Sequence, residues 1–137
     1  MSIISYSLGA ISEVTGSKHI LEIDGLPYMI DCGAWQGAEG AQKRNREFTF
    51  PVDKLQAVFL THAHYDHCGL LPKLIKDGYT GSIRSTPATR DLASIVMLDS
   101  AKIQKYEKGG PAYEESDVVE AINHFRCHAY RKEKVLD

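Results

Sequence analysis

The sequence predicts an α/β fold, a mixed β-sheet with helices outside it. Two apolar runs near the N-terminus flank Asp24-Gly25, a dipeptide typical of tight β-hairpins. Strand-like runs come first, and later strand-like and helix-like segments alternate, a pattern that suits one sheet layer covered by helices. The chain has 137 residues, enough for one domain with a core and too few to expect two.

The first half is predicted to form strands. Residues 2–8 are rich in β-branched and aromatic side chains, and a loop at 9–16 separates them from a second strand. The Asp24-Gly25 turn leads into a return strand, with Pro27 at its beginning, where a missing donor does least harm. The short apolar run at 57–60 is typical of a buried strand. The predicted strands of this half are residues 2–8, 18–23, 26–31 and 57–60.

The second half is predicted to alternate helix and strand. A short amphipathic helix is expected at 70–76, because Pro72 would fall in its tolerant first turn. A short strand at 82–85 follows, and then a helix at 87–105 that begins with Thr86 as N-cap and Pro87. The 3.6-residue period places one apolar stripe on this long helix, interrupted by an acidic residue. Its members are Leu92, Ile95, Val96, Asp99 and Ile103.

The C-terminal segments are less regular. Gly109-Gly110-Pro111 cannot continue a helix, so residues 107–116 are expected to form a loop. The spacing of Asp117 and Glu120 fits a capping box, which predicts a second helix to about Phe125. Residues 130–136 are expected to begin another strand.

Four potential metal ligands follow the buried strand at 57–60. They are His62, His64, Asp66 and His67, all within six residues. His62 and His64 are two apart and would point to the same side of an extended segment. Imidazole and carboxylate donors suit zinc and its first-row neighbours. A lone histidine is usually solvated or hydrogen-bonded, but this spacing would require four independent accidents. The cluster therefore predicts a metal site.

Three other histidines are predicted to be structural. His124 and His128 are four apart, a spacing that can chelate a metal on one helix face. However, the helix is expected to end between them, and no acidic third ligand is expected nearby. His19 lies on a strand with no neighbouring ligand, so a structural or solvated role is preferred there too.

Basic residues are concentrated in one segment, Lys43, Arg44 and Arg46. A solvated surface is the ordinary interpretation of such a cluster, and a phosphate contact is the sharper alternative. The net charge of −2 indicates no global attraction to polyanions, so any RNA-binding surface would be a local patch.

Cysteine usage and hydropathy predict a cytoplasmic setting. Cys32, Cys68 and Cys127 are odd in number and widely spaced, which favours neither a disulfide framework nor a separate zinc knuckle. A reducing compartment fits this pattern better. No apolar run reaches membrane-spanning length, and no secretory leader is evident, so no membrane partner is expected.

The sequence around the ligand cluster resembles a known family. The stretch from His62 to His67, His-Ala-His-Tyr-Asp-His, is similar to the H-x-H-x-D-H signature of the metallo-β-lactamase superfamily. The stretches Glu-Val-Thr-Gly-Ser at 13–17, Asp-Cys-Gly-Ala-Trp-Gln-Gly at 31–37 and Gly-Leu-Leu-Pro at 69–72 narrow the resemblance to the β-CASP branch. That branch contains RNA-processing nucleases related to the cleavage-and-polyadenylation endonuclease.

The resemblance implies a fold and a chemistry. The fold would be the N-terminal half of the αββα sandwich, a single partial domain over residues 1–137. The activity would be hydrolysis of RNA phosphodiesters by two Zn²⁺ ions, with His62 and His64 on one ion and Asp66 and His67 on the other. Asp66 would also be catalytic, holding or deprotonating the attacking water. Asp31 would support the site from behind by orienting a histidine or the loop, although such an Asp is ordinarily a turn residue.

The sequence also departs from the family pattern. A later metal-binding histidine and a bridging aspartate are not found, and neither the β-CASP insert nor the second half of the sandwich is present. Zinc binding is therefore expected to be weak or partial, and the chain alone inactive or weakly active. The alternatives are a short non-catalytic protein that binds, assembles or regulates, and another hydrolase of this fold, acting on a thioester or lactam. Half a sandwich would expose an apolar sheet face, so a homo-oligomer is expected.

Overall fold

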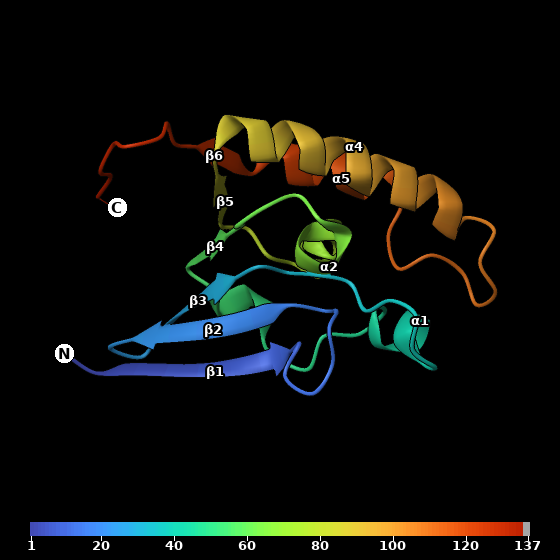
Figure 1. Cartoon of the computed structure of the whole chain (residues 1–137), viewed down its shortest axis with the longest axis horizontal. Coiled ribbons are helices and arrows are strands. Elements are labelled where there is room, and N and C mark those ends of the chain that lie inside the picture. The colour runs from blue at the N-terminus through green and yellow to red at the C-terminus, as the bar shows by residue number, and fades with distance from the viewer. Residues whose placement is uncertain (136–137) are drawn as a thin grey trace.

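The computed structural model describes residues 1–135, which contain one six-stranded mixed sheet (Figure 1). The strands follow the sheet in chain order; β1, β2 and β3 are antiparallel, and β3 to β6 are parallel. Their bounds are β1 Ile3–Gly9, β2 Lys18–Ile23, β3 Leu26–Ile30, β4 Ala57–Phe59, β5 Ser82–Ser85 and β6 Phe125–Cys127. The predicted α/β class and mixed sheet are confirmed, and β2 and β5 have the predicted bounds.

The turn between β2 and β3 has the predicted conformation. Asp24 and Gly25 have φ values of 49° and 80°, the left-handed pair that a type I′ hairpin requires. The register then pairs Ile23 with Leu26 and His19 with Ile30. Because β3 ends at Ile30, Asp31 follows directly at the sheet edge where the parallel strands β3 to β6 also end.

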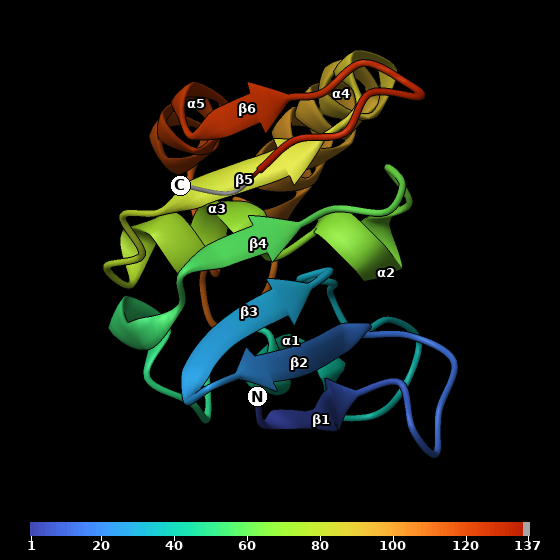
Figure 2. The same ribbon diagram turned by 90° about the vertical axis from the view of Figure 1, so that its left-hand side faces the viewer.

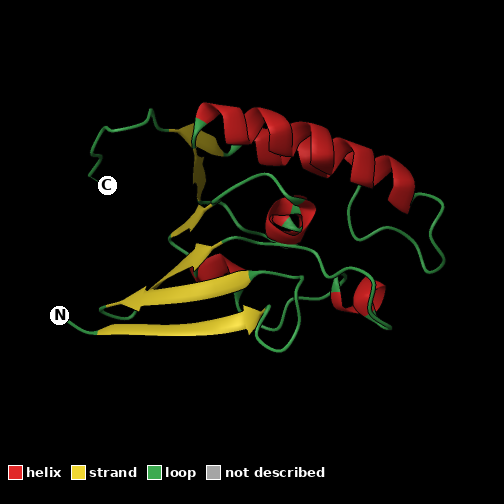
Figure 3. Cartoon of the chain, in the orientation of Figure 1, coloured by secondary structure: helices red, strands yellow, loops and turns green. Residues whose placement is uncertain are grey.

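The helices lie on one side of the sheet, as Figures 2 and 3 show. The α-helices are α1 Ala41–Arg44, α2 Tyr65–Cys68, α3 Leu71–Lys76, α4 Pro87–Gln104 and α5 Glu115–Asn123, and a 3₁₀ turn covers Val52–Lys54. One row of paired strand residues forms the sheet side of the core. This row runs Ile20, Met29, Val58, Ile83 and Phe125, each at most 7% exposed. No helix within residues 1–135 is long and apolar enough to span a membrane.

Helix α4 buries a different stripe from the predicted one. Its start is as predicted, since the Thr86 hydroxyl accepts a hydrogen bond from Thr89 N. The buried residues are Ala93, Met97, Ala101 and Gln104, whereas Leu92, Ile95 and Ile103 are 56–66% exposed. Of the predicted stripe, Val96 packs against the core, whereas Asp99 is exposed like the other three members. Two alanines let α4 approach α2 and α5 closely, and this packing outweighs the larger apolar surface on the opposite side.

The C-terminal elements also differ from the prediction. Helix α5 begins at Glu115, because Glu114 is its N-cap and Asp117 Oδ2 accepts from Glu114 N at 2.8 Å. Asp117 is thus the N3 residue at the end of the capping box rather than the N-cap at its start. Strand β6 at Phe125–Cys127 was missed, because it pairs in parallel with the distant β5. The predicted strand at 130–136 was wrong as far as residue 135, where the chain is turn and coil, and position 136 lies outside the described residues.

No helix of the described residues covers the other face of the sheet (Figure 2). Leu21, Ile23, Tyr28, Ile30 and Phe59 line a shallow, almost entirely apolar hollow there. Arg84 and Arg126 continue the row that begins with Ile30 and Phe59, so the face becomes basic toward β6.

Candidate metal centre

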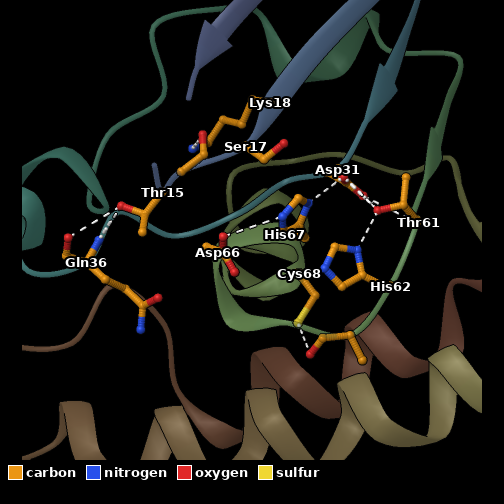
Figure 4. Close-up of polar contacts among 12 residues, drawn as sticks. Thr15, Ser17, Lys18, Asp31, Gln36, Thr61, His62, Asp66, His67 and Cys68 are labelled. Atoms are coloured by element: carbon orange, nitrogen blue, oxygen red, sulfur yellow. Dashed lines mark hydrogen bonds and ion pairs between the residues drawn. The ribbon is translucent and has the colours of Figure 1, made fainter. Parts of the chain in front are cut away.

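The four predicted ligands come together in space. His62 and His64 lie on the extended segment after β4, and Asp66 and His67 lie on the single turn of α2. The His62 ring centroid is 4.8 Å from that of His64 and 4.0 Å from that of His67. His67 Nε2 is 3.4 Å from Asp66 Oδ2. Figure 4 shows His62, Asp66 and His67 at the edge where the parallel strands end, and His64 lies beside His62.

Asp31 organises this cluster from behind. It is 3% exposed, its φ is 61°, and its carboxylate contacts the segment after β4. Asp31 Oδ1 accepts a hydrogen bond from Thr61 N at 2.8 Å, and Oδ2 lies 2.7 Å from His67 Nδ1. A carboxylate can only accept, so His67 donates from Nδ1, and in the neutral ring Nε2 then carries the lone pair available to a metal ion. This is the arrangement that orients a histidine for a metal ion.

Thr61 extends the same network to His62. Its hydroxyl donates to the Asp31 carboxylate at 2.8 Å from Oδ2, and the same oxygen lies 2.9 Å from His62 Nδ1. Because its one proton is directed at Asp31, Thr61 accepts from His62 Nδ1–H. His62 therefore also keeps a lone pair on Nε2. Sequence reasoning missed Thr61, although its position directly before His62 was the available signal.

Backbone hydrogen bonds hold the α2 turn in place. Cys32 N donates to His67 O at 2.9 Å, Ala34 N to Tyr65 O at 3.2 Å, and Ser17 N to Asp66 O at 2.9 Å. A Cβ added to Gly33 would overlap the Asp66 carbonyl group and lie 2.7 Å from His67 N. The loop that follows β3 (the strand-end loop) and the α2 turn that carries Asp66 and His67 (the ligand turn) are thus in direct backbone contact. This contact requires glycine at position 33.

The nitrogen and oxygen donors of this cluster are of the kind that zinc binds, although the four side chains do not all point at one position. Within residues 1–135, no three His, Cys, Asp or Glu side chains form a group already able to hold a metal ion. The fit rests on donor chemistry: Nε2 lone pairs on His62 and His67, with a third imidazole and a carboxylate beside them. His64 is exposed and Asp66 half-exposed, so both have room to turn inward.

The nearby cysteines are buried, neutral thiols. Burial raises the pKa of Cys32 and of Cys68 to about 12, so both thiols stay protonated at neutral pH. Cys68 Sγ instead donates to Ala63 O at 3.5 Å.

These buried thiols predict alkaline destabilisation. A thiol whose folded pKa is raised contributes stability below its unfolded pKa of 9.0, and this contribution is lost as pH rises toward 12. Chemical denaturation followed across pH 8 to 11 should therefore give a falling free energy of unfolding. Cys32→Ala is expected to reduce this slope, and Cys127→Ala, at a half-buried position, to leave it unchanged. Equal slopes in the wild type and Cys32→Ala would contradict the assignment.

The remaining histidines have structural partners, as predicted. His124 donates from Nδ1 to Gly81 O at 2.8 Å, and His128 Nε2 lies 3.2 Å from Arg84. His19 lies between the Ser7 and Ser17 hydroxyls, at 2.6 and 3.1 Å.

The basic cluster is largely engaged in structural contacts. Arg44 forms a two-point ion pair with Glu13 at 2.6 and 2.8 Å. Arg46 donates to Gly110 O and Lys108 O, which anchors the loop before α5. Of the three basic residues, two are thus occupied, which favours the ordinary interpretation over a phosphate contact.

Comparison with known proteins gives the same assignment at several levels. The model of the metallo-β-lactamase superfamily matches residues 18–124. A ribonuclease of Thermus thermophilus is 44% identical over 122 residues, covering 89% of this chain and 27% of that protein. The transcription termination factor FttA of Pyrococcus horikoshii is 42% identical over 126 residues, covering 85% and 19%. The chain thus spans about a quarter or less of the length of these two curated relatives.

A solved structure agrees in fold. The subclass B3 metallo-β-lactamase MEM-A1, from a soil metagenome library, superposes with a TM-score of 0.51 at 16% identity, covering 91% of this chain and 43% of the other. At that identity the likeness concerns the fold alone. The resemblance to the RNA-processing β-CASP branch is confirmed by the ribonuclease and termination-factor relatives. The chain belongs to the metallo-β-lactamase superfamily.

Proposed function

We propose that this chain provides the zinc-binding half of a ribonuclease-type hydrolase site. The observation that carries the proposal is the convergence of the four ligands around a histidine fixed by Asp31. The ribonuclease and termination-factor names of its relatives support RNA as the partner. The widely spaced free cysteines support a reducing, cytoplasmic setting.

The residues have separate roles in this proposal. His62 and His64 would hold one zinc ion, and Asp66 and His67 a second. Zinc there would supply Lewis-acid activation of water and of the phosphate group. The partly exposed Asp66 carboxylate would accept the proton of the attacking water. Asp31 and Thr61 would keep the histidine Nε2 atoms directed at the metals.

Zinc titration by calorimetry tests the proposal. The 137-residue chain should bind zinc, but more weakly than a complete ligand cage, because all the ligands come from one segment. His64→Ala should weaken binding by about 10-fold, and His124→Ala, outside the cluster, should leave it unchanged. No zinc binding, or equal binding by wild type and His64→Ala, would overturn the proposed site. Two tight zinc ions per chain would refute the expectation of an incomplete site.

An RNA cleavage assay separates the enzyme from the alternatives. We expect little or no cleavage by the isolated chain. Robust cleavage that is lost in His64→Ala would mean that further ligands come from a second copy. Zinc binding with no RNA binding would favour the non-catalytic alternative, and turnover of a thioester or lactam would favour the other hydrolase class.

We also propose that the chain self-associates through its open sheet face. Leu21, Ile23, Tyr28, Ile30 and Phe59 leave an apolar hollow that is unfavourable in water. Light scattering at micromolar concentration should give at least a dimer, and Tyr28→Lys should shift it toward monomer. Leu92→Lys, on the exposed side of α4, is the matched control and should not. A monomeric wild type would contradict the proposal, as would dissociation by the control substitution alone.

A further inference from the structure

Lys18 is a buried cation that the proposed site does not yet use. It begins β2 and is only 1% exposed. Its Nζ donates to Gly33 O at 2.6 Å and to Gly16 O at 3.3 Å, and it lies 3.5 Å from the centroid of the Trp35 ring. Its partners among residues 1–135 are thus carbonyl oxygens and an aromatic ring rather than a carboxylate.

A lysine in this environment is costly, which argues for a specific role. Removing an ammonium group from water carries a large free-energy penalty unless hydrogen-bond acceptors or opposite charges compensate for it. Burial accordingly lowers the pKa of Lys18 to about 8, so the charged form still prevails at neutral pH. An apolar side chain would fill the same space without this penalty, but it would leave the Gly33 carbonyl without its donor.

The Gly33 carbonyl belongs to the peptide that lies against the ligand turn. A Cβ on Gly33 would overlap the Asp66 carbonyl, so the two backbones are in contact. Gly33 N donates to Ser17 O, and Ser17 N donates to Asp66 O, both at 2.9 Å. Lys18 thus binds the Gly33 carbonyl, and the Gly33 peptide in turn packs against the turn that carries Asp66 and His67 (Figure 4).

Trp35 fixes the lysine in turn. Arg44 lies 4.6 Å from the same ring and is held by its ion pair with Glu13. Thr15 Oγ1 accepts from Gln36 N at 3.0 Å, which joins the segment before β2 to the segment after β3. The Lys18 ammonium therefore has little freedom to move away from the Gly33 carbonyl.

We propose that Lys18 is a positioning residue for the metal-binding turn. By holding the Gly33 peptide against α2, it sets the orientation of Asp66 and His67. This inference rests on the proposed zinc site, which it deepens. Lys18 touches neither the metal ligands nor a substrate, so its effect passes through the backbone.

Metal binding by the full chain tests the role of Lys18. Calorimetry with zinc and absorption spectra with Co²⁺ would compare wild type with Lys18→Met, which keeps the length and removes the donors. Lys76→Met, on the exposed end of α3, is the matched control. We expect Lys18→Met to weaken zinc binding by about 10-fold and to change the Co²⁺ bands, because the ligand geometry is altered. Lys76→Met should do neither.

The outcomes separate the two proposals. If Lys18 only stabilises the fold, Lys18→Met would lower the melting temperature and leave the Co²⁺ spectrum and zinc affinity of the folded chain unchanged. This result would overturn the inference while leaving the zinc site intact. Failure of the wild type itself to bind zinc would overturn both. If Lys18→Met does not fold, Lys18→Gln provides the same comparison, since its shorter side chain cannot reach the Gly33 carbonyl as the ammonium does.

Discussion

Replacing Gly33 with alanine is expected to lower the free energy of unfolding by more than about 3 kcal/mol, the upper end for overpacked sites. The new Cβ would overlap the Asp66 carbonyl group, which is backbone and cannot turn aside. The strand-end loop and α2 would have to separate, and the hydrogen bonds from Cys32 N and Ser17 N to the ligand turn would lengthen. Urea denaturation measures the loss of stability, and zinc titration measures the loss of the site.

Gly37→Ala is the control for Gly33→Ala. Gly37 has a φ of 74°, so alanine there is strained, but a Cβ would meet no atom within 4 Å. Its expected cost is about 1–2 kcal/mol from the left-handed conformation alone. A Gly33→Ala variant no less stable than Gly37→Ala, with unchanged zinc affinity, would mean that the close approach of loop and turn is unimportant.

Asp31→Asn is expected to weaken zinc binding by up to about 100-fold while leaving the chain folded. Asparagine keeps the size of the side chain, but its neutral amide is a poorer partner for His67 Nδ1–H and for the Thr61 hydroxyl. The Nε2 lone pairs of His67 and His62 would then no longer be fixed toward the metals. Calorimetry gives the affinity, and histidine ring NMR signals give the tautomers.

A matched acidic control is available for Asp31→Asn. Asp53→Asn, in the exposed 3₁₀ turn, removes the same charge away from the site and should leave zinc affinity unchanged. Equal affinities in wild type and Asp31→Asn would show that Asp31 serves the turn after β3 alone, which is the ordinary role of an aspartate there.

Local signals predicted much of the fold. The Asp24-Gly25 turn and the Thr86-Pro87 helix start depend on residues adjacent in sequence, and both were found where expected. Strand β6 and the buried face of α4 depend on distant partners. Met97 and the flanking alanines are buried because α4 packs on α2 and α5, which hydropathy along one helix does not reveal.

The candidate site, like the fold, has features that the sequence predicts and features that depend on distant contacts. The sequence by itself determined which residues are candidate ligands, because His62, His64, Asp66 and His67 all lie within one segment of six residues. Only the tertiary structure decided how those ligands are held. Asp31 lies 36 positions from His67, and Lys18 lies 15 positions from Gly33, so their contacts exist only once the sheet has formed. The physical reason is that hydrogen bonds and burial depend on distance in space, which the order of residues leaves open.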